Sequence, residues 1–222
     1  MTTSKRSIKE VLVRVIILFV GLTIAHLGVT LFLLADLGAD PFNVLIQGLF
    51  RTIASVTGAK LLTHGYTHVA VSLLIIAVLL LTDRSYVKIG TVICMVCGGP
   101  IIDFFTWMLG GIIHAENPFV MRIVVLALGC VILAFGMTIV IKSDSGTGPN
   151  DLVAIVISDK LKKPFGIVRI VVDVCFVLFG FLLGGAVGIG TLICAALVGP
   201  VAGIFLPRSE KVVHSIIKKL GV

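Results

Sequence analysis

The feature that most constrains this chain is a run of 21 residues between Arg14 and Asp36 that contains no Lys, Arg, Asp or Glu. At about 1.5 Å per helical residue, a helix of this length crosses the roughly 30 Å hydrocarbon core of a bilayer. The whole chain of 222 residues is 58% hydrophobic and only 13% charged, too little charge to cover the surface of a soluble domain. The run is too long for the apolar part of a signal peptide, so it predicts a retained first transmembrane helix.

Further apolar runs predict an all-α, polytopic membrane protein with six transmembrane helices. Two other apolar segments are interrupted by polar and charged residues, and we expect them to form short interfacial or re-entrant helices, because a charge at mid-membrane depth costs several kcal/mol. The five further runs are Tyr66–Thr82, Ile89–Gly110, Phe119–Ile141, Gly166–Gly184 and Gly188–Leu206, and the interrupted segments are Pro41–Gly58 and Pro149–Gly166.

The basic residues predict the orientation of the chain in the membrane. With the N-terminus inside, 14 of the 18 Lys and Arg residues fall in cytoplasmic segments, which agrees with the positive-inside rule. Both termini are therefore expected in the cytoplasm. The net charge of +7 is explained by topology, so no nucleic-acid partner is expected, and the bilayer is the expected surroundings.

The sequence also repeats itself. At an offset of 108 residues, Gly, Thr, Asp and Pro positions of the first half recur in the second, and after an eight-residue insertion the offset becomes 100. Identical small and turn-forming residues at fixed spacing indicate an internal duplication rather than chance likeness of apolar helices. The matched stretches are "LADLGADPFNVL" with "KSDSGTGPNDLV", and "IGTVICMVCGGPIIDFF" with "IGTLICAALVGPVAGIF".

Each copy has three crossings, and three is odd, so the second copy enters the membrane in the opposite sense from the first. This predicts two inverted repeats related by a pseudo-two-fold axis in the membrane plane, as in many secondary transporters. The expected parts are a cytoplasmic basic N-terminus (1–10), membrane repeat 1 (11–110), an inverted membrane repeat 2 (119–206) and a basic cytoplasmic tail (207–222). The turn of the first repeat would face outward and that of the second inward.

The repeated turns supply most of the candidate substrate-binding residues. Glycine permits a left-handed or tight backbone and proline suits the first turn of a helix. A helix start directed into a cavity suits an anion, whereas the adjacent carboxylates suit a cation or a proton, so the sign of the ligand stays open. Both turns can equally be plain caps between two helices. The candidates are Asp36, Gly38, Asp40, Pro41 and Asn43 in the first copy, and Asp144, Gly146, Thr147, Pro149, Asn150 and Asp151 in the second.

Ionisable residues inside the predicted spans complete the candidate site. His26, Asp103 and Asp173 are expected to face a cavity or a charged partner, although His26 can equally be a neutral histidine that packs between helices. Arg169 precedes Asp173 by four residues, and we expect a structural ion pair between them on one helix face. Asp103 breaks the repeat, because Gly203 stands at the matching position.

The remaining motifs give little evidence of a function. "CMVC" lacks a second cysteine pair, and His64 and His68 of "HGYTH" have no third ligand nearby, so neither a metal nor a cofactor is expected. The tail "RSEKVVHSIIKKLGV" is typical of a basic amphipathic helix lying on the inner leaflet. "GFLLG" can pack helices within one monomer or between two copies, so a homodimer stays open. No nucleotide-binding loop or catalytic elbow is present, and an enzyme is not expected.

The paired "LGADPFN" and "GTGPND" turns and the twin "IGT…IC…GP" segments resemble the bacterial YczE/YyaS/YitT family of integral membrane proteins, over about Val11 to Leu206. The resemblance implies a bacterial cytoplasmic membrane location and, because no soluble C-terminal domain follows, the short YczE-type branch. It implies no activity. Our leading hypothesis is a small-solute permease with a path between the repeats; the alternative is a membrane scaffold or regulator that docks a cytoplasmic partner through its basic loop and tail.

Overall fold

A computed structural model describes residues 7–58 and 64–220, and within these ranges the chain is all-α. Of the predicted N-terminal and tail segments, residues 1–6 and 221–222 lie outside the described ranges. The elements are α1 (Ile8–Ala35), α2 (Pro41–Thr57), α3 (His64–Thr82), the short 3-10 helix η1 (Arg84–Tyr86), α4 (Ile89–Leu109), α5 (Phe119–Ser143), α6 (Pro149–Leu161), α7 (Phe165–Leu182) and α8 (Ile189–Lys219).

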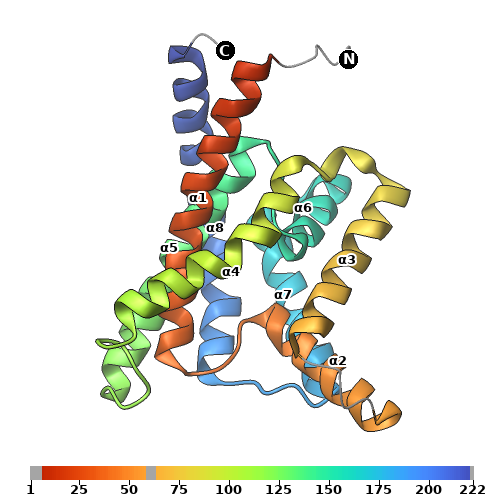
Figure 1. The fold of residues 1–222 in the computed structure, drawn as a ribbon, viewed down its shortest axis with the longest axis vertical. Helices are drawn as coiled ribbons and strands as arrows, with labels where there is room; N and C mark the ends of the chain where they lie inside the picture. Colours follow the sequence, from red (N-terminus) through yellow and green to blue (C-terminus); the bar gives the residue numbers. More distant parts are fainter. Residues whose placement is uncertain (1–6, 59–63, 221–222) are drawn as a thin grey trace.

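Six of the described helices are long and apolar enough to cross a membrane, namely α1, α3, α4, α5, α7 and α8. They match the six apolar runs of the sequence, and the chain is a multi-pass membrane protein. Figure 1 shows that α1 begins and α8 ends at the same end of the bundle, drawn at the top. We call this the terminal end, and the other the opposite end.

Helices α1 and α5 form an antiparallel pair with the most extensive contact among the described helices (Figure 1). Glycines at the contact let the two backbones approach closely, as small residues do in membrane helix pairs. A Cβ added at Gly28 would lie 2.5 Å from the carbonyl oxygen of Gly129, and one at Gly136 would lie 2.2 Å from the backbone nitrogen of Ala25. The close fit of this pair therefore depends on residues of both halves of the chain.

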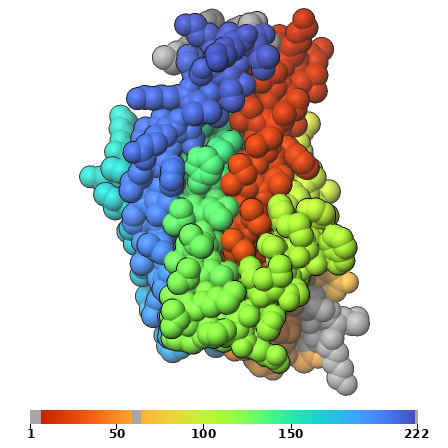
Figure 2. Space-filling model, turned by 90° about the vertical axis from the view of Figure 1, so that its left-hand side faces the viewer, coloured from red at the N-terminus to blue at the C-terminus, as the bar shows by residue number. Residues whose placement is uncertain are grey.

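The remaining helices pack around this pair in two sets. Helix α4 packs on α1 and α8 packs on α5, while α2 and α7 pack against each other, with α3 and α6 beside them. Figure 2 shows α8, α5 and α1 side by side on one face. The main core of buried apolar side chains lies among α5, α6, α7, α8 and the end of α1, and includes Phe32, Leu126, Ala154, Val168 and Val198.

The C-terminal tail differs from the sequence-based expectation. It continues α8 without a break through Pro200 and Pro207 to Lys219, so the tail is the end of a long helix rather than a helix of its own. Val213 and Ile217 are buried against Ile17 of α1. The tail is therefore held against α1 by two buried apolar side chains, while Val212 and Ile216 remain exposed.

Candidate functional site

The turn after α1, which we call turn 1 (Asp36–Asp40), ends one helix and starts the next. Asp36 adopts the left-handed conformation with φ of 48° and caps α1, and Gly38 has φ of 137°. Asp40 is the N-cap of α2, and its carboxylate accepts a hydrogen bond from the backbone N–H of Asn43 at 3.2 Å. Pro41 occupies the first turn of α2, as the sequence predicts.

The turn after α5, which we call turn 2 (Asp144–Gly148), has the same backbone form. Asp144 is left-handed with φ of 55° and caps α5, and Gly146 has φ of 122°. Gly148 is the N-cap of α6 and offers no side-chain cap, while Pro149 occupies the first turn. The two turns lie at opposite ends of the α1–α5 pair (Figure 1).

Each turn contacts the first residues of a helix from the other half of the chain. The N–H of Gly190, in α8, donates to the carbonyl of Leu37 in turn 1, and the N–H of Gly90, in α4, donates to the carbonyl of Ser145 in turn 2, both at 2.8 Å. A Cβ at Gly38 would lie 2.9 Å from the Cα of Gly188, and one at Gly146 would lie 2.6 Å from the backbone nitrogen of Thr91 in α4. Glycine is therefore required in each turn both by φ and by space.

Two arginines that sequence analysis missed also link the halves. Arg14 of α1 donates to the carbonyl of Ser143 at the end of α5 at 3.1 Å, and Arg122 of α5 donates to the carbonyl of Ala35 at the end of α1 at 2.7 Å. Basic side chains at a helix C-terminus satisfy carbonyls that have no partner within the helix. Arg14 and Arg122 are themselves 108 residues apart, so the repeat offset was the signal that could have identified them.

The two contacts differ in the partner of one threonine hydroxyl and in one basic side chain. At turn 1, the Thr191 hydroxyl of α8 donates to the carbonyl of Ala39. At turn 2, no described residue forms a hydrogen bond with the buried hydroxyl of Thr91 in α4 or with that of Thr147 in the turn, and each such hydroxyl costs on the order of 1–3 kcal/mol. Turn 2 is instead linked to α4 by Lys88, which donates to the carbonyl and the carboxylate of Asp144.

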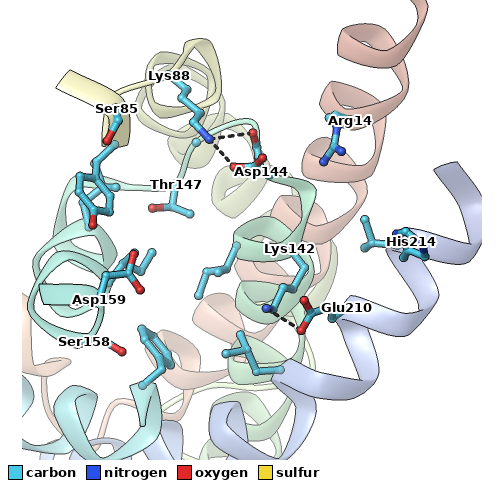
Figure 3. A pocket seen from close by; sticks show the side chains of 18 of the residues that line it. Arg14, Ser85, Lys88, Lys142, Asp144, Thr147, Ser158, Asp159, Glu210 and His214 are labelled. Atoms are coloured by element: carbon cyan, nitrogen blue, oxygen red, sulfur yellow. Dashed lines mark hydrogen bonds and ion pairs between the residues drawn. The ribbon is translucent and has the colours of Figure 1, made fainter. Parts of the chain in front are cut away.

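A cavity lies beside each turn. The larger, about 750 Å³, is at the terminal end between α1, η1, α5, α6 and α8, and the smaller, about 340 Å³, lies beside turn 1 and includes Asp40 and Asn43 in its lining. In Figure 3, Thr147 is drawn between two ion pairs at the larger cavity, Lys88 with Asp144 and Lys142 with Glu210. The lining also includes Arg14, Gly146, Tyr86 and Asp159.

The larger cavity carries both signs of charge, since Arg14, Lys88 and Lys142 stand with Asp144, Asp159 and Glu210. At its edge in η1, burial and the nearby Asp159 carboxylate raise the pKa of the Tyr86 hydroxyl. Tyr86 therefore stays a neutral donor at physiological pH. Such a lining suits a small polar or zwitterionic molecule better than an apolar one.

Deeper in the bundle, three charged side chains meet. Arg169 of α7 donates to Asp173, one helical turn on, at 2.9 Å, which confirms the predicted pair, and also to Asp151 in the first turn of α6 at 2.6 Å. Arg169 and Asp173 are 7% and 1% exposed. The structure thus brings two candidate residues, Asp151 and Asp173, to the same guanidinium.

The other candidates lie apart from this triad. His26 is half-buried, bonds through Nδ1 with the carbonyl of Leu22, and its Nε2 faces Gly98 of α4. Asp103 lies on the exposed side of α4, not in the interior where we expected it, because its position on α4 is off the face that packs on α1. Asn150 is half-buried beside Gly148.

The two histidines of "HGYTH" do lie on a helix, at the start of α3. His64 contacts the side-chain oxygen of Asn43 at 3.2 Å, and the His68 ring packs edge-on against Phe42. Within the described residues no group of three potential metal ligands occurs. Packing and hydrogen bonding thus account for both rings.

Known proteins match this chain over most of its length. The chain is similar to the membrane protein YczE of Bacillus subtilis, 28% identical over 93% of this chain and 91% of YczE, and to YyaS of the same organism, 26% identical over 86% and 92%. A Haemophilus influenzae protein is 28% identical over 89% of this chain and 85% of its own length. No solved structure matches. The model of a family of unknown function, DUF6198, matches residues 12–207. The chain therefore belongs to this family, as a YczE-type membrane protein.

Proposed function

We propose that the protein is a small-solute permease of the bacterial cytoplasmic membrane, with a path between two inverted repeats and both termini in the cytoplasm. The proposal rests on two matched backbone contacts between the halves of the chain, one at each end of the α1–α5 pair. They join Leu37 with Gly190 and Ser145 with Gly90. A duplicated turn that meets the partner half at opposite ends is the expected geometry of an alternating-access transporter.

The arginine contacts support the same symmetry. Arg14 and Arg122 each cap the helix on which the other stands, at opposite ends of the pair. The helices that follow match as well, since α4 packs on α1 as α8 packs on α5. In this proposal α2 and α6 are the short re-entrant helices that close the two entrances.

The difference between the turns indicates which state the structure represents. The end held by the Thr191–Ala39 hydrogen bond has the smaller cavity, and the end where Thr91 has no partner has the larger one. We assign the structure to a state open toward the terminal end, which we place in the cytoplasm. In the alternate state, the Thr91 hydroxyl would donate to the carbonyl of Thr147, which is the residue equivalent to Ala39.

The test uses two matched variants with opposite expected effects. Thr191→Val removes a bond of the present state, whereas Thr91→Val removes a bond that only the alternate state would form. In a background with the five cysteines replaced by alanine, we expect Thr191→Val to raise maleimide labelling of Ala39→Cys and Thr91→Val to lower it. One hydrogen bond of about 1 kcal/mol corresponds to roughly a fivefold change in population. The same direction of change in both variants would contradict alternating access.

Transport itself is tested in proteoliposomes, after a thermal-shift screen of the purified protein identifies a ligand. A solute that binds the folded protein raises its melting temperature by mass action. We expect both threonine variants to slow uptake of that solute, while Asp103→Asn, on the exposed side of α4, leaves uptake unchanged. Equal uptake by the wild type, both threonine variants and empty liposomes would exclude a permease of that solute.

One observation favours the alternative, a scaffold that docks a cytoplasmic partner. Lys160, in the last turn of α6, and Lys162 and Lys163, just after it, are all exposed, and the basic end of α8 lies at the terminal end (Figure 1). The test is complementation of a strain that lacks the protein. If the variant with these three lysines replaced by glutamine failed to complement while Thr191→Val and Thr91→Val both did, the scaffold would be the better assignment.

A further inference from the structure

The Asp151–Arg169–Asp173 triad carries unequal charge. One guanidinium stands between two carboxylates, so the group has one negative charge in excess when both aspartates are ionised. Asp173 is 1% exposed. A net charge held in so dry a place is costly unless another group balances it.

The unbalanced charge has a specific position. Oδ2 of Asp173 accepts from Arg169, but Oδ1 of the same carboxylate is buried and receives no hydrogen bond from any described residue. Asp151 is less buried, and its Oδ1 accepts a short bond from Arg169. Among the described residues, Oδ1 of Asp173 is therefore the fully buried acceptor of the triad that no hydrogen bond satisfies.

The groups that face Asp173 from neighbouring helices do not supply the missing positive charge. Asp40 of α2 is near enough to interact electrostatically, and it is acidic; Cys194 of α8 carries no positive charge in either protonation state. On α1, His26 interacts with Asp151 but bonds to a backbone carbonyl within its own helix. On α3, His68 interacts with Asp40 rather than with the triad.

We propose that the triad is a proton-binding site in which one exchangeable proton resides on Oδ1 of Asp173 while Asp151 and Arg169 form the ionised pair. Binding the proton turns two carboxylates and one guanidinium into a neutral set, and release leaves the excess charge behind. The site stands on the triad alone; its use to couple solute movement to a proton gradient rests on the proposed function. Intramembrane carboxylates with this environment are typical of proton relays.

The test is pH-difference infrared spectroscopy of the protein in liposomes, without any solute and in buffer free of sodium and potassium. We expect a C=O stretch of a protonated carboxyl group that is lost in Asp173→Asn. The sharper variant is Asp151→Asn, which keeps Asp173 but removes the excess charge, so Asp173 stays ionised against Arg169 and the band is lost as well. Asp103→Asn, exposed on α4, retains the band.

Each variant leaves at least one carboxylate paired with Arg169, so both are expected to fold, which size-exclusion chromatography checks. A band that persists in Asp151→Asn would overturn the proposal, because protonation would then not depend on the excess charge. So would carboxylate bands that shift with sodium or potassium rather than with pH, since a metal cation would then balance the triad. Neither result depends on whether the protein transports a solute.

Discussion

Turn 1 and turn 2 share one backbone form but differ in chemistry. In turn 1 the N-cap of the following helix is Asp40, and Asn43 donates back to it at 2.6 Å. In turn 2 the N-cap is Gly148, and Asp151, at the position of Asn43, bonds to Arg169 instead. Because glycine needs no side-chain partner, the third residue of α6 is released for a contact with α7. The first turn is thus capped locally, whereas the second takes part in a buried charged site.

The largest effect is expected at the charged triad, where Arg169 is compared with an exposed arginine of the first half. Arg169→Met leaves Asp151 and Asp173 buried without their cation, which is expected to cost about 3–5 kcal/mol of unfolding free energy. Arg51→Met, the same change at an exposed arginine, is expected to cost about 1 kcal/mol or less. Chemical unfolding in detergent measures both, and equal losses would show that the triad contributes nothing particular.

The next effect tests whether both turns need glycine. Gly38→Ala and Gly146→Ala each force a side chain into a positive-φ position, at a cost of order 1–3 kcal/mol. The added Cβ at Gly146 would also lie 2.6 Å from the backbone nitrogen of Thr91, so we expect this variant to lose more stability. Gly99→Ala is the control, since its Cβ meets nothing within 4 Å. Tolerance of alanine in either turn would contradict the need for glycine there, and tolerance in only one would show that the two turns are not equivalent.

A smaller effect tests the difference in capping. Asp40→Ala removes the N-cap of α2 and is expected to lower the free energy of unfolding by about 1 kcal/mol. Gly148→Ser adds a hydroxyl at the matching position of α6 and is expected to change it by only a few tenths of a kcal/mol. Thermal unfolding of the two variants side by side gives the comparison, and a loss at Gly148 equal to that at Asp40 would contradict it.

The smallest effect concerns acid stability at the terminal end, between α3 and η1. Hydrogen bonds from the Ser85 hydroxyl and backbone N–H lower the pKa of Asp83. A carboxyl whose folded pKa is lowered stabilises the fold above its unfolded pKa, and this contribution is lost as pH falls through the folded value. Ser85→Ala is therefore expected to make the unfolding midpoint slightly less dependent on pH below about 4. An unchanged acid slope would show that the bond is not kept in solution.

The sequence was enough to predict the spans, the two turns and the Arg169–Asp173 pair, because charge-free length, glycine, proline and helical spacing are local signals. It could not predict that Asp151 joins the pair, since that contact links residues 18 apart across a turn whose path depends on packing. Asp103 was misplaced because one charge in an apolar run does not reveal which face of the helix packs. The continuous α8 was missed because Pro207 and a basic tail are typical of a helix end.

Helix α8 carries Thr191, which bonds to turn 1, near one end, and lines the larger cavity with Leu206, Glu210 and Val213 near the other. The single helix α8 thus runs from turn 1 to the larger cavity at the terminal end. Pro200 and Pro207 each remove one backbone hydrogen bond from it, so bending costs least at these two places. Any bend that moves the two ends of α8 relative to each other is therefore expected to form at these prolines.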